Sequence, residues 1–285
     1  MLALTLWHIA DWRKALPAIR AIRPDAIQLH ADPDTLAARG LAIKGKLIAE
    51  LGDAAPREWW VGIAGDVGQG AGAKNRVALR ERGAQAAFDI EATRVVLNCE
   101  AAWKRSLFGF QAPDAIEFVE LARDIAQCPV YVTSFDCPGY HSTFPWAAFD
   151  SADGWLPQIY AAPAKGEPAP NSKQGRARLK LHQVKWEQAV HRGLLKRRPV
   201  VGYVQAHHVV ARETMWLLDA HDETCMWAAP ERMDAQGLLA ARAFTDLERR
   251  GYTGKGRVIR FQQDNGLTVD GLCGPQTFQA LGLSL

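Results

Sequence analysis

One acidic residue stands out because it directly follows an apolar segment of the chain. Glu100 comes after Val95, Val96 and Leu97, and Asn98 precedes it by two positions. Side chains two residues apart on a β-strand share a face, so Asn98 and Glu100 should project together if this segment is a strand. A carboxylate against an apolar wall needs a partner or a task, and a glutamic acid there can donate a proton as a general acid. We therefore predict that Glu100 is catalytic.

Polar and aromatic residues follow the other apolar segments and supply the remaining candidates. Asp66 and Asp136 are the candidates for a second catalytic carboxylate. Ten tryptophans is a high number for this length, and Trp103 and Trp146 fall in loops, where they are our candidates for stacking on sugar rings. The predicted substrate-binding side chains are Asn98, Gln158, Tyr160, Trp103, Trp146, Trp227, His30 and His207.

A regular scaffold has to position these residues, and the chain shows one. Short β-branched or apolar segments alternate with longer segments whose apolar residues recur every three or four positions. We predict strands at residues 2–9, 26–30, 59–65, 94–100, 129–135, 154–161, 199–206 and 224–229. We predict helices at residues 11–22, 41–51, 74–90, 113–126, 172–190 and 208–220, with a single turn at 145–149. Such alternation implies parallel strands joined by right-handed crossovers.

Eight strand–helix units over roughly 230 residues predict a closed (β/α)8 barrel, the TIM barrel, in the α/β class. Catalytic groups in such a barrel lie at the C-terminal ends of the strands, which is where the candidates above fall. The alternative fold is an open doubly wound sheet. It is less favoured because no GxGxxG or GxxxxGK[ST] motif follows the first strand.

The tail of the chain differs from the barrel segments. Residues 235–250 predict a helix, and the turn residues Asp270-Gly271 and Gly274-Pro275 separate two short helices after it. The tail resembles the small three-helix peptidoglycan-binding domain of wall hydrolases through Phe261-Gln262, Asn265-Gly266-Leu267, Val269-Asp270-Gly271, Gly274-Pro275, Thr277 and Ala280-Leu281. The resemblance covers about 50 residues and implies a small all-α module that binds peptidoglycan. We place the barrel at residues 1–232 and the module at 233–285, with the helix at 235–250 shared because the loop at 251–256 is short.

Shorter resemblances concern the barrel. Leu97-Asn98-Cys99-Glu100 resembles the Asp-x-Glu ending of the fourth strand in family-25 lysozymes and chitinase-type barrels, which implies that Glu100 protonates a glycosidic oxygen. Gln158-Ile159-Tyr160 and Trp227 are similar to residues that line the sugar subsite of chitinase-type enzymes. This chain has Asn98 where those families carry an aspartate. The second catalytic group would therefore be Asp66, Asp136 or the N-acetyl group of the substrate.

Composition and charge narrow the class of protein. Hydrophobic residues make up 48% and charged residues 23%, and no apolar run reaches the roughly 18 residues that a membrane span needs. Five scattered cysteines without a CxxC pair argue against a disulfide framework and a zinc cage. The N-terminus lacks a basic lead and reaches Asp11 early, so we predict a strand and no signal peptide. We therefore expect synthesis in a reducing cytoplasm and action on the wall after release.

The net charge of +3 is unevenly distributed, because residues 171–198 hold nine Lys and Arg against Glu187 alone. Two interpretations stay open: a solvated helix face, or attraction to an anionic envelope surface. No aromatic residues are interleaved in a pattern typical of nucleic-acid binding, so we expect no nucleic-acid partner.

Together, the residues and the resemblances predict a peptidoglycan glycosidase of the muramidase or glucosaminidase type, acting as a phage endolysin or an autolysin. We expect a monomer that needs no cofactor and no metal. Two alternatives stay open. A metal-dependent peptidoglycan amidase or peptidase would use His30, His207 or His208 with Asp66, although the chain has no HExxH motif. A non-catalytic wall-binding protein would bind the wall without releasing fragments.

Overall fold

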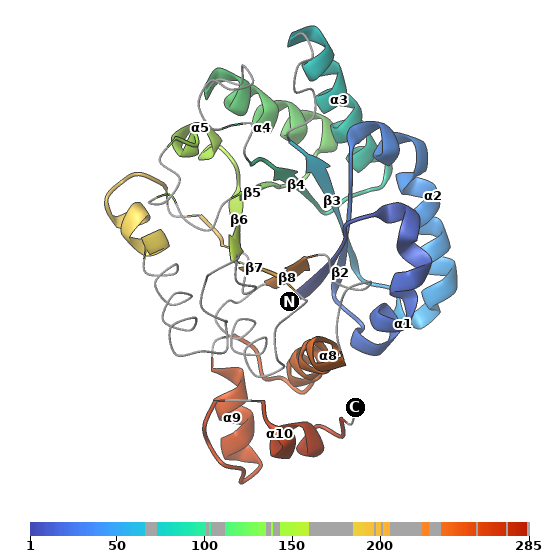
Figure 1. Ribbon diagram of the computed structural model, residues 1–285, viewed down its shortest axis with the longest axis vertical. Coiled ribbons are helices and arrows are strands. Elements are labelled where there is room, and N and C mark those ends of the chain that lie inside the picture. Colours follow the sequence, from blue (N-terminus) through green and yellow to red (C-terminus); the bar gives the residue numbers. More distant parts are fainter. Residues whose placement is uncertain are drawn as a thin grey trace, which may run out of the picture.

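The computed structural model describes residues 1–65, 73–100, 103, 112–134, 138, 143–159, 185–196, 198–200, 202–205, 224–227, 235–254, 256–271 and 273–283. Its centre is a closed barrel of parallel strands in the order β1 to β8, with β8 paired to β1 (Figure 1). The strands are β1 Leu2–Leu6, β2 Ala26–Ala31, β3 Glu58–Ala64, β4 Arg94–Asn98, β5 Val130–Ser134, β6 Gly154–Ile159, β7 Gly202–Gln205 and β8 Thr224–Trp227. The predicted (β/α)8 fold is confirmed.

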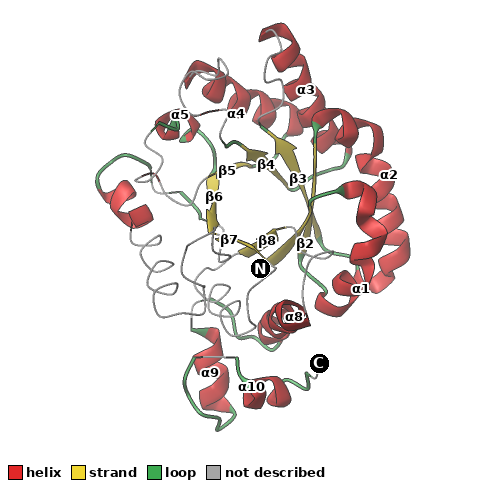
Figure 2. Ribbon diagram, in the orientation of Figure 1, coloured by secondary structure: helices red, strands yellow, loops and turns green. Residues whose placement is uncertain are grey.

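Helices surround the barrel on its outer side (Figure 2). They are α1 Trp12–Ile22, α2 Pro33–Leu51, α3 Ala73–Asp89, α4 Ala112–Ala126, the short α5 Trp146–Phe149 and α8 Ala235–Arg249. Residues 185–191 are also helical. The predicted helix at 208–220 and most of the one at 172–190 lie outside the described residues. No helix in the described part of the chain is long and apolar enough to cross a membrane.

The start of α2 was predicted wrongly, because the helix begins at Pro33 and not at residue 41. The Asp32 side chain accepts a hydrogen bond from the backbone N–H of Thr35 at 2.9 Å, and Pro33 takes the first helical position. Both are signals of a helix start, an N-cap carboxylate followed by a proline at N1. The prediction followed the apolar spacing from Leu41 onward and ignored these polar signals.

The core has two parts, separated by the barrel wall. The larger part lies between the strands and the surrounding helices. The smaller part fills the N-terminal half of the barrel interior with Ala3, Ala26, Trp60, Val96, Tyr131, Leu156 and Cys225. The Arg94 guanidinium lies over the rings of Trp60 and Tyr131, 4.1 and 4.2 Å from their centroids. The inward positions that follow along the strands are mostly polar, so polar groups gather toward the C-terminal ends of the strands.

A small helical region follows the barrel, with α9 at Arg257–Asp264 and α10 at Pro275–Ala280 (Figure 1). The helix α8 contacts both α1 and β1 of the barrel and also α9. The Thr245 hydroxyl on α8 donates to the carbonyl of Ile22 at 2.8 Å, which ties α8 to the end of α1. The C-terminal region is therefore helical, as predicted, and α8 connects it physically to the barrel.

Candidate active site

The predicted catalytic glutamate lies just beyond β4, at the C-terminal end of the barrel. Gln158 on β6 reaches it across the barrel interior. The Gln158 side-chain amide donates to Glu100 Oε1 at 2.8 Å and to Asn98 Oδ1 at 3.2 Å. Glu100 is partly exposed, whereas Asn98 and Gln158 are buried. The structure therefore brings together three predicted site residues from two strands, and one amide group fixes the orientation of the other two.

A second group of polar side chains continues this lining, and we name the whole set the polar mouth. It consists of Thr5, Gln28, His30, Asn98, Glu100, Thr133 and Gln158. Gln28 Oε1 accepts from the Thr5 hydroxyl at 3.3 Å and from the Cys225 thiol at 3.5 Å. Burial raises the pKa of the Cys225 thiol to about 12, so this sulfur is protonated at neutral pH and is not a nucleophile.

Three buried atoms of the polar mouth have no hydrogen-bond partner among the described residues. They are Gln28 Nε2, His30 Nε2 and Thr133 Oγ1. Gln28 and Thr133 were not predicted as site residues. Their signal in the sequence is weak, because a single polar residue within an apolar strand is also compatible with a hydrogen-bonded core position. Unpaired buried polar atoms in a native fold need an explanation, and a site that receives a polar ligand or an ordered water supplies one.

His30 is held as a neutral imidazole inside the barrel. Its ring stacks on the indole of Trp7, with centroids 4.0 Å apart and planes within 8°. Burial lowers the pKa of His30 to about 4, and the neighbouring His8 contributes to the same shift. His30 therefore does not act as a cation at neutral pH. Trp7, directly after β1, is a member of this site that the sequence prediction missed.

Gly62 on β3 makes room for this arrangement. A Cβ atom at position 62 would lie 2.4 Å from Gln28 Nε2 and 2.6 Å from His30 Cδ2. The absence of a side chain is thus what allows Gln28 and His30 to occupy the interior at the level of the polar mouth.

Trp103 does not present its ring to a ligand as we predicted, because only 2% of its surface is exposed. Its indole packs edge-on against Phe149, with centroids 4.8 Å apart. The indole N–H donates to the carbonyl of Gly65 at 3.1 Å, and the backbone N–H donates to the carbonyl of Glu100 at 3.1 Å. Trp103 therefore joins the end of β3 to the turn after Glu100, which is a supporting role.

Trp146 is also buried, with 7% of its surface exposed, so the stacking role predicted for it is wrong as well. Its ring lies among Phe144, Trp155 and Trp186, at centroid distances of 4.8, 5.5 and 5.9 Å. An aromatic residue in a predicted loop can belong to the core, and here a short helix, α5, turns it inward.

Several predicted site residues lie outside the described residues. They are Asp66, Asp136, Tyr160, His207 and His208, and of Trp227 only the backbone, on β8, is described. Among the described residues, no group of three His, Cys, Asp or Glu side chains is placed to hold a metal ion. The four described cysteines, Cys99, Cys128, Cys225 and Cys273, are free thiols.

The C-terminal helices are organised around one buried amide. Gln262 on α9 donates to Asp270 Oδ1 at 2.8 Å and to Thr277 Oγ1 at 3.2 Å. Its side-chain oxygen accepts from the backbone N–H groups of Asp270 and Gly271, at 3.2 and 2.9 Å. Gly271 has a φ of 70°, which favours glycine, so the Asp-Gly turn seen in the sequence is a real turn. Gln262 thus fastens this turn to α9 and α10.

Comparison with known proteins agrees with the prediction for this region. Residues 229–281 match the family model described as "Putative peptidoglycan binding domain". The chain therefore carries a C-terminal domain similar to this family, and the resemblance predicted from the tail is confirmed. No curated protein matches the sequence of this chain.

Solved structures resemble the barrel at low sequence identity. A D-psicose 3-epimerase studied with D-fructose has a TM-score of 0.51 and 9% identity, over 87% of this chain and 98% of that one. A probable tagatose 6 phosphate kinase from Sinorhizobium meliloti 1021 has a TM-score of 0.53 and 12% identity, over 93% and 70%. The PgaB (BpsB) glycoside hydrolase domain from Bordetella bronchiseptica has a TM-score of 0.49 and 12% identity, over 81% and 93%. At such identities the two likenesses with TM-scores above 0.5 show the barrel fold alone.

Proposed function

We propose that this chain is a peptidoglycan-degrading glycoside hydrolase in which Glu100 is the general acid. The observation that carries the proposal is the position of Glu100, a partly exposed carboxyl at the C-terminal end of β4, bonded at 2.8 Å to the buried Gln158 amide. That is the end at which TIM barrels carry their catalytic groups. The family match at residues 229–281 supplies the substrate class, because it is similar to domains named for peptidoglycan binding.

The chemistry follows from the groups around Glu100. Its carboxylic acid gives a proton to the glycosidic oxygen as the bond from that oxygen to the sugar carbon breaks, and water then adds to the sugar. The Gln158 amide and Asn98 orient the carboxyl group. The developing positive charge on the sugar needs a second group, and the candidates remain Asp66, Asp136 and the substrate's own N-acetyl group.

The finer features of the proposal remain as the sequence predicts them. The bond cleaved is of the muramidase or glucosaminidase type, and the protein acts as a monomeric endolysin or autolysin that reaches the wall after release from the cytoplasm. Residues 1–232 form the catalytic barrel and 233–285 the wall-binding module, with α8 shared. The contacts of α8 with both the barrel and α9 support that division.

The proposal is tested by replacing Glu100 with glutamine, which keeps the size of the side chain but cannot donate a proton as an acid. General acid catalysis contributes about 100- to 10,000-fold, so the release of soluble fragments from insoluble peptidoglycan should fall by that factor. Sedimentation of the variant with the wall should be unchanged. The control is Glu120→Gln, which changes an exposed glutamate on α4 and should leave the rate as it is.

Three outcomes contradict the proposal in different ways. Near-normal hydrolysis by Glu100→Gln would show that Glu100 is not the general acid. Loss of hydrolysis in a chelator, with Glu100→Gln still active, would favour a metal-dependent amidase or peptidase. Strong wall binding by the unmodified protein without any release of fragments would identify a non-catalytic wall-binding protein.

A further inference from the structure

A cavity of about 340 Å³ lies at the opposite end of the barrel from Glu100. It is bounded by the loops that lead into β2 and β3 and by α8. Charged side chains dominate its lining, which includes Arg23, Asp25, Asp53, Arg57, Glu248 and Arg249. The N-terminal end of a TIM barrel usually serves stability, so a charged cavity there calls for a separate explanation.

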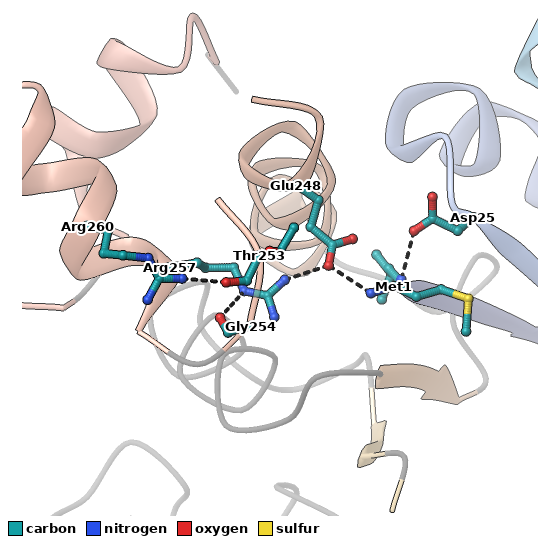
Figure 3. A network of polar contacts seen from close by, with 8 residues as sticks. Met1, Asp25, Glu248, Thr253, Gly254, Arg257 and Arg260 are labelled. Atoms are coloured by element: carbon teal, nitrogen blue, oxygen red, sulfur yellow. Dashed lines mark hydrogen bonds and ion pairs between the residues drawn. The ribbon is translucent and has the colours of Figure 1, made fainter. Parts of the chain in front are cut away.

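Three of these side chains are already engaged. Glu248 Oε1 accepts from the amino group of Met1 and from Arg257, both at 2.7 Å, and Asp25 Oδ2 accepts from the backbone N–H of Leu2 at 3.0 Å (Figure 3). Arg249 pairs with Asp246 at 3.2 Å. Glu248, Asp25 and Arg249 therefore already bind other groups of the protein.

The side chains of Arg23, Arg57 and Asp53 form no hydrogen bond or ion pair with any residue that the structure describes. The backbone nevertheless holds both arginines in place. Arg23 ends α1 in the left-handed conformation, at φ 50°, and its carbonyl accepts from the Arg249 guanidinium at 2.6 Å. The backbone N–H of Arg57 donates to the carbonyl of Asp25 at 3.0 Å. Two arginines with fixed backbones therefore line one cavity, and neither guanidinium group is paired with a described residue.

We propose that this cavity is a binding site for an oxyanion, a carboxylate or a phosphate, held by Arg23 and Arg57. A guanidinium group presents paired N–H donors in the geometry that carboxylates and phosphates accept. Asp53 opposes a second negative charge and can accept a hydrogen bond from an N–H or O–H beside the oxyanion. Because α8 belongs to both the cavity and the C-terminal module, the oxyanion is one carried by the wall polymer that the module meets, such as a peptide carboxylate or a polymer phosphate.

The site is tested by calorimetric titration of the full chain with sodium acetate and with sodium phosphate, each at an ionic strength held constant with sodium chloride. The unmodified protein should bind at least one of the two saturably. The double variant Arg23→Gln/Arg57→Gln should bind at least tenfold more weakly, and Asp53→Asn should bind several-fold more tightly. Arg39→Gln, which removes an exposed arginine on α2 outside the cavity, is the matched control and should bind normally.

Two results would overturn the site: no saturable binding of either anion, or binding that the double variant retains. Unfolding curves check that the double variant folds, which we expect because both arginine side chains are exposed and pair with no residue that the structure describes. The source of the oxyanion is then found by sedimentation with whole wall and with wall stripped of its phosphate polymers. A defect of the double variant on both walls indicates a peptide carboxylate, and a defect on whole wall alone indicates a phosphate. Equal sedimentation of the double variant and the unmodified protein on both walls would contradict a wall ligand. None of these measurements depends on Glu100, so the site and the proposed hydrolysis fail or stand separately.

Discussion

Two regions of this molecule bury polar groups. In the first the buried charges are paired, and in the second several buried polar atoms have no partner among the described residues. The junction, formed by Met1, Glu248 and Arg257, pairs its charges: one carboxylate oxygen receives two cations at 2.7 Å (Figure 3). Arg257 is fully buried, and its guanidinium also lies 4.0 Å from the ring centroid of Phe244. The polar mouth instead leaves Gln28 Nε2, His30 Nε2 and Thr133 Oγ1 without partners in the described structure.

This difference in pairing distinguishes the junction, which holds two parts of the fold together, from the polar mouth, which is the candidate active site. A buried charge that is paired stabilises the arrangement that pairs it, whereas an unpaired buried polar atom costs free energy that the fold has to supply elsewhere. The junction therefore fixes how the C-terminal helices sit on the barrel. The unpaired atoms of the polar mouth carry such a cost, which is common at functional sites. Five substitutions test this contrast, from the largest expected effect to the smallest.

Glu248→Gln should have the largest effect on stability, because it removes the carboxylate that pairs with both the buried Arg257 and the amino group of Met1 at 2.7 Å. Breaking a buried ion pair from one side typically costs about 3–5 kcal/mol. Urea unfolding measures the loss, and Glu120→Gln, at an exposed position, should stay within about 0.5 kcal/mol of the unmodified protein. A change below about 1 kcal/mol for Glu248→Gln would show that the junction contributes little to the free energy of unfolding.

His30 makes stability depend on pH. Its pKa in the folded protein is about 4, below the ordinary value of 6.5, so the unfolded chain binds an additional proton between these pH values. The free energy of unfolding should therefore fall as the pH is lowered from about 6.5 to about 4, by roughly 3 kcal/mol.

In His30→Asn that contribution disappears, and unfolding measured at pH 7 and at pH 4 should show a smaller decrease than in the unmodified protein. The exposed His191→Asn serves as the control and should keep the full decrease. Identical pH profiles for His30→Asn and the unmodified protein would show that His30 is not buried as a neutral ring.

Gly62→Ala tests the space at the polar mouth. The new Cβ would displace Gln28 and His30, and overpacking of this kind costs about 1–3 kcal/mol. If the polar mouth is the site, hydrolysis of peptidoglycan should fall more than stability alone explains. Gly45→Ala is the matched control, because a Cβ there meets nothing within 4 Å and alanine favours the helix by about 0.5–1 kcal/mol. Equal activity in both variants would contradict a site at this level of the barrel.

The smallest effects come from two threonine-to-valine changes of opposite expected sign. Thr133→Val removes a hydroxyl that has no partner among the described residues and should be neutral or stabilising by up to about 1 kcal/mol. Thr277→Val removes the acceptor of the Gln262 amide, 3.2 Å away, and should destabilise by about 1 kcal/mol. Thermal unfolding of both variants measures the difference. If both variants change the stability by the same amount and in the same direction, the contrast between the paired and the unpaired hydroxyl is wrong.

The barrel was predictable because each strand is an apolar segment bounded by turn residues. This pattern can be recognised in the sequence without knowing which strands pair. The proximity of Asn98 and Glu100 was predictable for the same reason, since they lie two positions apart where β4 ends. The bond from Gln158 was not, because it crosses from β6 to β4 and exists only once the barrel closes. The start of α2 was predicted wrongly, although Asp32 and Pro33 are residues typical of a helix start.

Burial of single side chains was the weakest part of the prediction. Trp103 and Trp146 follow strands and resemble loop aromatics, yet their rings complete the outer core, where packing by α4 and α5 decides their orientation. Gln28 and Thr133 could not be separated from ordinary core positions, because the absence of a partner is a property of three dimensions. The roles of Asp66, Asp136, Tyr160, His207 and Trp227 stay predictions.

Cleavage of the glycan strand of peptidoglycan through Glu100 is the activity that we propose for this chain. Mass spectrometry of the soluble fragments released from purified peptidoglycan tests it most directly, since cleavage of a glycosidic bond and cleavage of an amide bond leave different ends. We predict new reducing sugar ends in the digest by the unmodified protein, and none above background with Glu100→Gln. New amino groups without new reducing ends, or the same reducing ends from Glu100→Gln, would contradict it.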